Sequence, residues 1–407
     1  MSNMTNEQSF AHQQKLLEKE IEGLSREKLP TANIIVAGKT GAGKSTLLNA
    51  VFGNEFAAVG TGRPVTDQIK EYQNSDIPIR IWDTVGLELD SKKTKGSINA
   101  IKHTVAVKSE SGDKFDRIHA IWYCVNSGTN RYEGAELEFI QDLHAIGVPF
   151  IIVLTQCYAA KSKINEFVDI INKTNREKGM SDISVVKVLA QDFSVEIGDS
   201  VLKVPSYGLN DLVNKTLKEL PAFIKSGFAA AQKISKSEKR TACEEIIYEY
   251  ICAAKYGFWD KVPLINVFTT DKKIFNMFKK IGQLYNTVLK EEDIKKITQG
   301  AHIDFKNAFW GLVAPVDLVG YNRKIADLLQ SKKEDGFNVY YEHFTNNERA
   351  ARMIAFYGYT FIDSIEELWE KSTEEELKKV DIVVEKLIEI INRNLSKREN
   401  EYRQSRR

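Results

Sequence analysis

A glycine-rich loop between an apolar segment and a helical pattern constrains this chain more than any other feature. Residues 38–46 read Gly-Lys-Thr-Gly-Ala-Gly-Lys-Ser-Thr, which fits the phosphate-binding pattern G-x-x-x-x-G-K-[ST]. Residues 34–36 are apolar and β-branched, and apolar residues recur at helical spacing after the loop. Glycines let the backbone turn its N–H groups toward an anion, and the positive end of the following helix points to the same place. The sequence therefore predicts a P-loop that binds a nucleoside triphosphate.

The side chains of this loop have distinct predicted roles. Lys44 is expected to reach the β- and γ-phosphates, where it serves both binding and catalysis. The Ser45 hydroxyl is expected to bind Mg²⁺. The predicted nucleotide-binding residues of the loop are Lys39, Thr40, Gly41, Ala42, Gly43, Lys44, Ser45 and Thr46.

Hydrophobic periodicity divides the chain into three regions. Residues 1–30 are a polar leader with a short predicted helix, and strand and helix patterns alternate over residues 31–225. Such alternation predicts a three-layer α/β P-loop domain, with a mostly parallel sheet covered by helices. Over residues 226–407 the strand signals fade, which predicts an all-helical domain. The predicted strands are Asn33–Ala37, Gln68–Gln73, Ile77–Trp82, Ile118–Val125, Phe150–Leu154 and Ser184–Leu189.

Helices are predicted in both halves of the chain. Residues 87–114 are less regular and carry only a weak helical stripe, and the polar stretch 233–239 is interpreted as a linker. The predicted helices after the P-loop helix are Glu133–Ile146, Ile164–Glu177, Gly208–Lys225, Lys272–Leu289, Asp293–Phe309, Arg349–Trp369 and a last one from Glu374 to about Leu395.

Charge and hydropathy favour a globular, cytoplasmic protein. The formal net charge is +1, so no overall basic character points to nucleic acid. Residues 1–22 lack the apolar core of a signal peptide, and no apolar run approaches the ~18 residues of a membrane span. The more apolar segment 307–321 is either a membrane-touching element or, as the favoured alternative, a buried helical hairpin broken at Pro315.

Two further segments complete a predicted hydrolase site. Asp83 ends an apolar strand and is followed by Gly86, so its carboxylate is expected to hold Mg²⁺ through water and the Gly86 N–H to meet the γ-phosphate. The turn-rich segment 59–67 lies between this motif and the P-loop. The Thr66 hydroxyl is predicted to complete the coordination shell of Mg²⁺, and Thr61 is the alternative. The predicted catalytic residues are Lys44, Thr66 and Gly86, and the predicted metal ligands are Ser45, Thr66 and Asp83.

These segments resemble the Era-like branch of the translation-factor-related (TRAFAC) GTPases. The resemblance rests on residues 38–50, Pro64–Thr66 and Trp82–Gly86, and it covers about half the chain. Residues 117–126 and 131–136 are similar to one bacterial group of predicted GTPases within that branch, in which a small helical domain often follows. The resemblance implies a slow molecular switch that binds GTP and Mg²⁺ and hydrolyses GTP to GDP and phosphate. It also implies that the helical domain responds to the nucleotide state.

The base-reading motif departs from this family. Where the family has N/T-K-x-D, this chain has Thr155-Gln-Cys-Tyr, so Gln156 replaces the lysine and Tyr158 replaces the guanine-binding aspartate. The resemblance implies that Thr155, Gln156 and the backbone of Ala190 contact the nucleotide. Guanine preference follows from the family alone, and ATP stays an alternative ligand.

A second departure concerns the attacking water. Leu87 occupies the position where Ras-like proteins carry a water-orienting glutamine. The resemblance therefore implies slow intrinsic hydrolysis, with K⁺, an activating partner or a homodimer supplying the missing group. Arg63 and Arg131 are candidates for such a group, although each is more simply interpreted as a solvated loop arginine.

Two other functional classes stay open on the sequence. One is a nucleotide-gated binding module that takes GTP or ATP, hydrolyses little and acts on an unknown protein partner. The other is a dynamin-like membrane-associated GTPase, although a clear membrane-insertion segment is missing. No sequence feature specifically supports contact with a membrane or a ribosome.

Overall fold

The computed structural model describes most of the chain as two compact units. Pro30–Glu238 form the first unit, and Lys239–Arg407 with the residues before Pro30 form the second, called here the helical unit. The predicted boundary between residues 225 and 226 lies inside helix α8 (Ala222–Ala231) of the first unit. The structure describes residues 28–53, 56, 63–66, 69–73, 77–84, 91–110, 112–129, 132, 135–197, 200–255, 270–303, 321–329 and 346–405.

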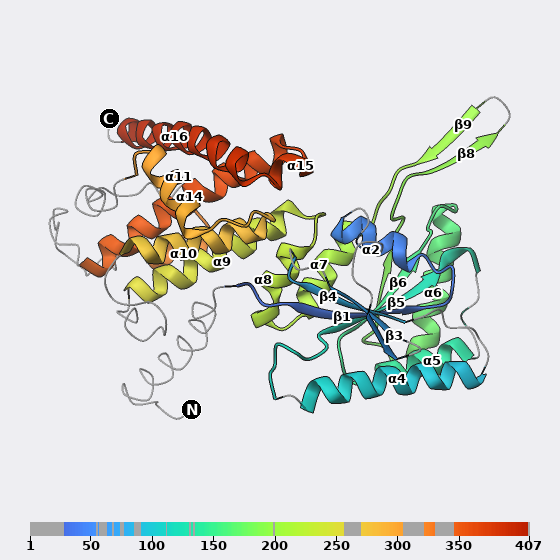
Figure 1. Cartoon of the computed structure of the whole chain (residues 1–407). Helices are drawn as coiled ribbons and strands as arrows, with labels where there is room; N and C mark the ends of the chain where they lie inside the picture. The colour runs from blue at the N-terminus through green and yellow to red at the C-terminus, as the bar shows by residue number, and fades with distance from the viewer. Residues whose placement is uncertain are drawn as a thin grey trace, which may run out of the picture. The chain divides into compact units, whose positions relative to one another are not determined.

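The first unit is built on a seven-stranded sheet with the order β2-β3-β4-β1-β5-β6-β7 (Figure 1). Strand β1 lies at its centre and pairs in parallel with β4 and β5, and the ladders β5–β6 and β6–β7 are parallel as well. Only β3 runs antiparallel to the other strands of this sheet, through its ladders with β2 and β4, so the predicted mostly parallel α/β fold is confirmed. The strands are β1 (Ala32–Gly38), β2 (Arg63–Thr66), β3 (Ile69–Gln73), β4 (Ile79–Thr84), β5 (Ala120–Asn126), β6 (Phe150–Thr155) and β7 (Ser184–Lys187).

Helices cover both faces of this sheet because its central strands are apolar on both faces. Ile35 and Ala37 of β1 belong to a core shared with α4, α5 and α6. The alternate side chains must face the other layer, where α2 and α8 contact β1. In that layer the Trp122 indole N–H of β5 donates to Thr216 of α7 at 3.1 Å. The helices are α2 (Lys44–Phe52), α4 (Ser91–Glu110), α5 (Ala135–His144), α6 (Lys161–Glu177), α7 (Leu209–Glu219) and α8.

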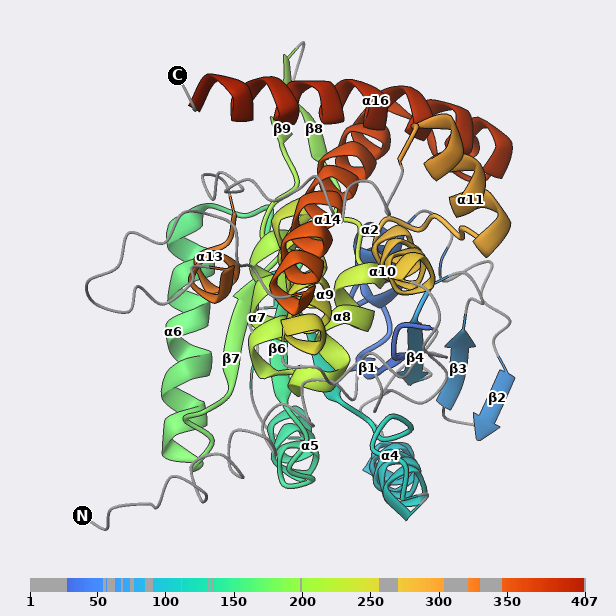
Figure 2. The ribbon, with the colours of Figure 1, turned by 90° about the vertical axis from the view of Figure 1, so that its left-hand side faces the viewer.

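Several element predictions need correction in the first unit. The helix predicted over residues 208–225 is two helices, α7 and α8, because Pro221 interrupts it. Residues 91–110 form one regular helix instead of an irregular region. Strand β2 and an antiparallel hairpin, formed by β8 (Phe193–Ile197) and β9 (Ser200–Val204), are further elements that were not predicted. Figures 1 and 2 show this hairpin extending away from the main sheet.

The helical unit has α14 at its centre. Helix α14 packs against α10 and α16, and α11 packs against α16 (Figure 2). Phe278 of α10 stacks on Phe361 of α14 with ring centroids 4.2 Å apart, which shows how closely these helices approach. The helices are α9 (Lys236–Lys255), α10 (Thr270–Leu284), α11 (Glu291–Gly300), α13 (Arg323–Leu329), α14 (Asn346–Lys371), α15 (Glu374–Leu377) and α16 (Val380–Ser405).

Three predictions for this region also change. The predicted linker 233–239 contains the start of α9, and Lys239 is fully buried there, where its ammonium group donates to the Leu284 carbonyl at 2.6 Å. The helix predicted from Asp293 to Phe309 begins at Glu291 and ends at Gly300. The last predicted helix is divided into α15 and the much longer α16.

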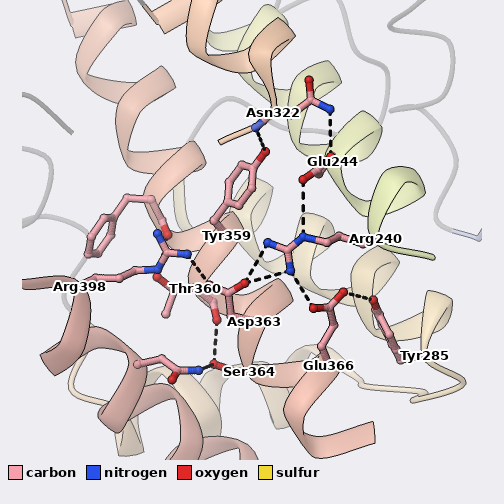
Figure 3. A network of polar contacts seen from close by, with 12 residues as sticks. Arg240, Glu244, Tyr285, Asn322, Tyr359, Thr360, Asp363, Ser364, Glu366 and Arg398 are labelled. Carbon is pink, nitrogen blue, oxygen red and sulfur yellow. Dashed lines mark hydrogen bonds and ion pairs between the residues drawn. The ribbon is translucent and has the colours of Figure 1, made fainter. Parts of the chain in front are cut away.

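A polar network joins three helices of this unit (Figure 3). Arg240 of α9 contacts Asp363 at 3.0 Å and Glu366 at 2.7 Å, both on α14. Arg398 of α16 contacts the other oxygen of Asp363. The Tyr285 hydroxyl donates to Glu366 at 2.9 Å. The three helices are therefore held together by charge-assisted hydrogen bonds as well as by apolar packing.

Some predicted features lie outside the described residues. They are the leader helix, Thr61, Gly86, Leu87, Arg131 and segment 307–320, together with the side chains of Arg63 and Thr66. Within the described parts of the chain, no helix has both the length and the apolar character needed to cross a membrane.

Candidate functional site

The glycines at residues 38, 41 and 43 give the P-loop its shape. A Cβ atom on Gly38 would lie 2.5 Å from the Cys124 carbonyl oxygen of β5, so only glycine allows this close approach of strand and loop. Gly41 and Gly43 both have φ of +79°, in the left-handed region that other residues rarely adopt. This backbone geometry is what an anion-binding loop requires.

Lys44 crosses the mouth of this loop. Its ammonium group donates to the carbonyl oxygens of Gly38 at 2.8 Å and Lys39 at 3.2 Å. Helix α2 begins at Lys44, and among the described residues no side chain caps it. The first-turn N–H groups, with the exposed Ser45 and Thr46, therefore face a place suited to phosphate and metal.

Lys39 has a different side-chain role from Lys44. Its ammonium group lies 2.6 Å from Glu136 Oε2 on α5, and the Glu136 side chain is only 3% exposed. The Tyr123 hydroxyl donates to the other Glu136 oxygen at 3.2 Å. This pair ties the P-loop to α5, which leaves the Lys39 backbone as its contribution to a nucleotide. No sequence pattern assigns Glu136 to the site, because its partner Lys39 lies far away along the chain.

Asp83 lies beside the P-loop with an unsatisfied carboxylate. It pairs in register with Val36 of β1, two residues before the loop begins. Its Oδ1 atom is buried without a hydrogen-bond partner among the described residues. Burial raises the pKa of Asp83 to about 6, because desolvation outweighs the opposing effect of the Lys44 and Lys70 ammonium groups. A buried, unpaired oxygen of this kind fits a place beside a hydrated cation.

The residues present therefore fit Mg²⁺. Asp83 and the exposed Ser45 are the groups that would hold it, and the ion would neutralise phosphate charge there. Thr66, whose backbone is described, pairs with Ile69 at a bulge, and Ile69 pairs with Thr84, so Thr66 belongs to the same end of the sheet. Thr66 was predicted in a loop and instead ends the edge strand β2.

The segment after β6 reaches the P-loop from the other side. The Thr155 hydroxyl donates to the Ala42 carbonyl at 2.7 Å, and the Gln156 side-chain amide donates to the Gly41 carbonyl at 2.8 Å. Gln156 has φ of +55°, and its own carbonyl accepts a hydrogen bond from Ser127. These two predicted site residues therefore contact the loop directly. The structure brings together the P-loop, Asp83 and residues 155–156, which are far apart in the sequence.

Comparison with known proteins agrees with this geometry. Residues 33–156 match the family model described as "50S ribosome-binding GTPase". This match indicates a P-loop GTPase domain in the first unit. The chain is 40% identical over 78 residues to GTPase Der of Persephonella marina, a match covering 18% of this chain and 17% of that relative. It is 25% identical over 221 residues to GTPase HflX of Thermococcus kodakarensis, covering 50% of this chain and 47% of that relative. The chain thus spans less than half the length of either relative.

Solved structures are similar only at a low level. The probable GTP-binding protein EngB is 18% identical with a TM-score of 0.31, and the match covers 46% of this chain and 97% of that one. Era from Aquifex aeolicus is 18% identical with a TM-score of 0.32, covering 55% of this chain and 67% of that one. The fold assignment rests on the sheet order and the P-loop instead of these scores.

The buried carboxylate gives a prediction for the metal-free and nucleotide-free protein. We expect Asp83→Asn to raise the free energy of unfolding by about 3 kcal/mol at about pH 7.5, because a pKa of about 6 replaces one of 3.8 on folding. The folded protein holds this proton more tightly, so ionised Asp83 costs stability as the pH rises from about 4 to about 6, and the cost persists above that. Asparagine has no such cost.

Urea unfolding in EDTA, repeated between about pH 4.5 and about pH 7.5, measures the effect. The exposed Asp142, changed to asparagine, is the control and should alter stability by less than about 0.5 kcal/mol. An equal gain for Asp83→Asn at both ends of the pH range would contradict an origin in ionisation.

Proposed function

We propose that this protein binds GTP with Mg²⁺ and hydrolyses it to GDP and phosphate as a slow switch of the Era-like type. The observation that carries the proposal is the left-handed glycine loop crossed by Lys44, next to the unpaired Oδ1 atom of Asp83. The match of residues 33–156 to a GTPase family model supports it. The chain spans only part of its relatives, so the activity of the whole protein is part of the proposal.

Each residue of the site has a separate role in the proposed function. Lys44 exchanges the carbonyl oxygens of Gly38 and Lys39 for phosphate oxygens, which are stronger acceptors because they are charged. The N–H groups of the loop and of α2 surround the β-phosphate. Thr155 and Gln156 hold the loop from behind, so its shape is fixed before the nucleotide arrives. In this proposal, Thr66 and Gly86 contact the metal and the γ-phosphate.

The short edge strand β2 suits a nucleotide-dependent switch. It spans only Arg63–Thr66, and its pairing with β3 shifts register between Pro64 and Thr66. An edge strand with so few ladder bonds opens at small cost. Contact of Thr66 with the metal and the γ-phosphate would order it, and hydrolysis would release it. The helical unit would then respond to this change.

A second function is favoured by one specific observation. Tyr158 occupies the position of the guanine-binding carboxylate, so guanine selection by that route is lost. A nucleotide-gated binding module, which takes GTP or ATP and hydrolyses little, fits this departure. Such a protein would act on a partner when a nucleotide is bound, without needing to hydrolyse it.

One set of measurements tests both functions. We expect GTP and GDP to bind the purified protein at micromolar concentrations in Mg²⁺ and at least about tenfold more weakly in EDTA. We expect GTP to be hydrolysed at about 10⁻⁴ to 10⁻² s⁻¹, the range of GTPases without an activating partner. Phosphate release is measured in K⁺ and in Na⁺ and over a range of protein concentration. Faster turnover in K⁺ or at high concentration would identify the ion or a homodimer as the activator.

The possible outcomes separate the two functions. Failure of every triphosphate to bind would refute both. Tight binding without phosphate release under any of these conditions would favour the binding module. The partner is proposed only by class, as a protein that recognises the triphosphate state in the cytoplasm. The family description names the 50S ribosome, so co-sedimentation with ribosomal subunits in each nucleotide state is the first partner test.

A further inference from the structure

The hairpin formed by β8 and β9 begins next to the predicted base site. Phe193 starts β8 three residues after Ala190, whose backbone is the predicted contact to the base. The two strands pair only with each other and stand apart from the seven-stranded sheet (Figures 1 and 2). An isolated two-stranded hairpin is marginally stable in water, so the contacts at its foot decide where it lies.

Two contacts attach the foot of this hairpin to the loop that follows β6. The Phe193 ring stacks on the Tyr158 ring with centroids 4.2 Å apart and an interplanar angle of 15°. The Tyr207 hydroxyl donates to the Cys157 carbonyl at 2.8 Å, and Tyr207 and Leu189 exchange two backbone hydrogen bonds. The hairpin and the loop at residues 155–158 therefore form one connected structure.

This loop is also the one that holds the P-loop. Thr155 and Gln156 donate to P-loop carbonyl oxygens, and Tyr158 follows two residues later with 39% of its surface exposed. The stacked pair thus presents open aromatic surface at the place where related GTPases carry a guanine-binding carboxylate. Asp192 is a poor substitute for that carboxylate, because its Oδ1 atom accepts a hydrogen bond from the Ser206 N–H at 2.8 Å within the hairpin.

We propose that Tyr158 and Phe193 form an aromatic base-recognition surface, by which this protein binds purine nucleoside triphosphates without reading the 2-amino group of guanine. The inference rests on the proposed function, since it takes the P-loop as the triphosphate site. Every nucleobase has a flat face that can contact an aromatic ring, whereas only guanine offers both N1–H and the 2-amino group to a carboxylate. In this arrangement Tyr158 determines the base specificity, and Phe193 contributes affinity for any nucleobase.

Competition against a fluorescent triphosphate in Mg²⁺ tests the proposal with GTP, ITP and ATP. ITP is the analogue of GTP that lacks the 2-amino group of the base. We expect wild-type affinities for GTP and ITP to agree within about threefold, and Tyr158→Asp to make GTP at least about tenfold tighter than ITP. We expect Phe193→Leu, which keeps an apolar side chain but removes the ring, to weaken all three nucleotides about fivefold or more without changing their ratios.

A matched control lies on the same hairpin. Val201 pairs with Glu196, so it is on the face opposite Phe193, and it is 55% exposed. Val201→Ala should leave every affinity within about twofold of wild type. Wild-type GTP at least tenfold tighter than ITP would overturn this inference while the proposed function stands. Unchanged affinities in Phe193→Leu would overturn it too, and failure of all triphosphates to bind would overturn both.

Discussion

Replacing Lys44 with alanine is expected to lower the affinity for GTP by at least about 100-fold. Its ammonium group is already directed at the loop, where it donates to the carbonyl oxygens of Gly38 and Lys39 at 2.8 and 3.2 Å. When a triphosphate binds, charged phosphate oxygens replace these neutral acceptors. Each such hydrogen bond contributes roughly 1.5–3 kcal/mol, and two of them correspond to a factor of about 100 or more.

Equilibrium titration with fluorescent GTP in Mg²⁺ measures this loss, and GDP should lose less because it lacks the γ-phosphate. The control is Lys163→Ala, which removes the same charge from an exposed position on α6 and should leave affinity within about twofold. Thermal unfolding of both variants shows whether the loop substitution affects the fold. Wild-type affinity in Lys44→Ala would mean that the triphosphate binds elsewhere.

The central sheet could be predicted because its strands are buried on both faces. Residues 34–37 and 150–154 are continuous apolar runs, a pattern typical of a strand covered by helices on both sides. The hairpin β8–β9 gives a much weaker signal. Its strands are five residues long with mostly polar side chains on one face, and within the described residues they pair with each other alone. Short alternating segments of this kind are also typical of surface loops.

The helix errors have local physical causes. Pro221 cannot continue α7, and this residue alone was sufficient to predict the break before α8. Lys239 caused a different error. Lysine is rarely buried, so the polar stretch that contains it was interpreted as a linker instead of the start of a helix. Its burial depends on the Leu284 carbonyl, a partner distant in the sequence that no local pattern reveals.

Some residues of the candidate site could be predicted from the sequence, and others could not. The P-loop and Asp83 could be predicted because their geometry depends on backbone shape and on strand ends, both of which are local in the sequence. The contact between Lys39 and Glu136 could not be predicted, because it depends on how α5 packs against the sheet. The same holds for Phe193, whose contact with Tyr158 requires the position of the hairpin.

Replacing Arg240 with methionine is expected to lower the stability of the helical unit by about 3 kcal/mol. The guanidinium group contacts Asp363 at 3.0 Å and Glu366 at 2.7 Å, and the Glu366 side chain is only 9% exposed (Figure 3). Removing the cation takes a charged partner away from a nearly buried carboxylate, to which Tyr285 still donates. Methionine keeps most of the apolar volume of the arginine side chain. The loss of stability therefore comes from the missing charge and not from a cavity.

Hydrogen exchange of α9 and α14 measures this effect, because it resolves the helical unit from the rest of the chain. Adding Glu366→Gln should restore part of the loss, because the double variant no longer places a carboxylate charge beside the missing guanidinium group. The control is Lys295→Met, which breaks an exposed pair with Glu291 on α11 and should change stability by less than about 0.5 kcal/mol. If Arg240→Met cost no more than this control, the network would contribute nothing to holding α9 against α14. Additive losses in the double variant would instead show that Arg240 and Glu366 act on stability independently.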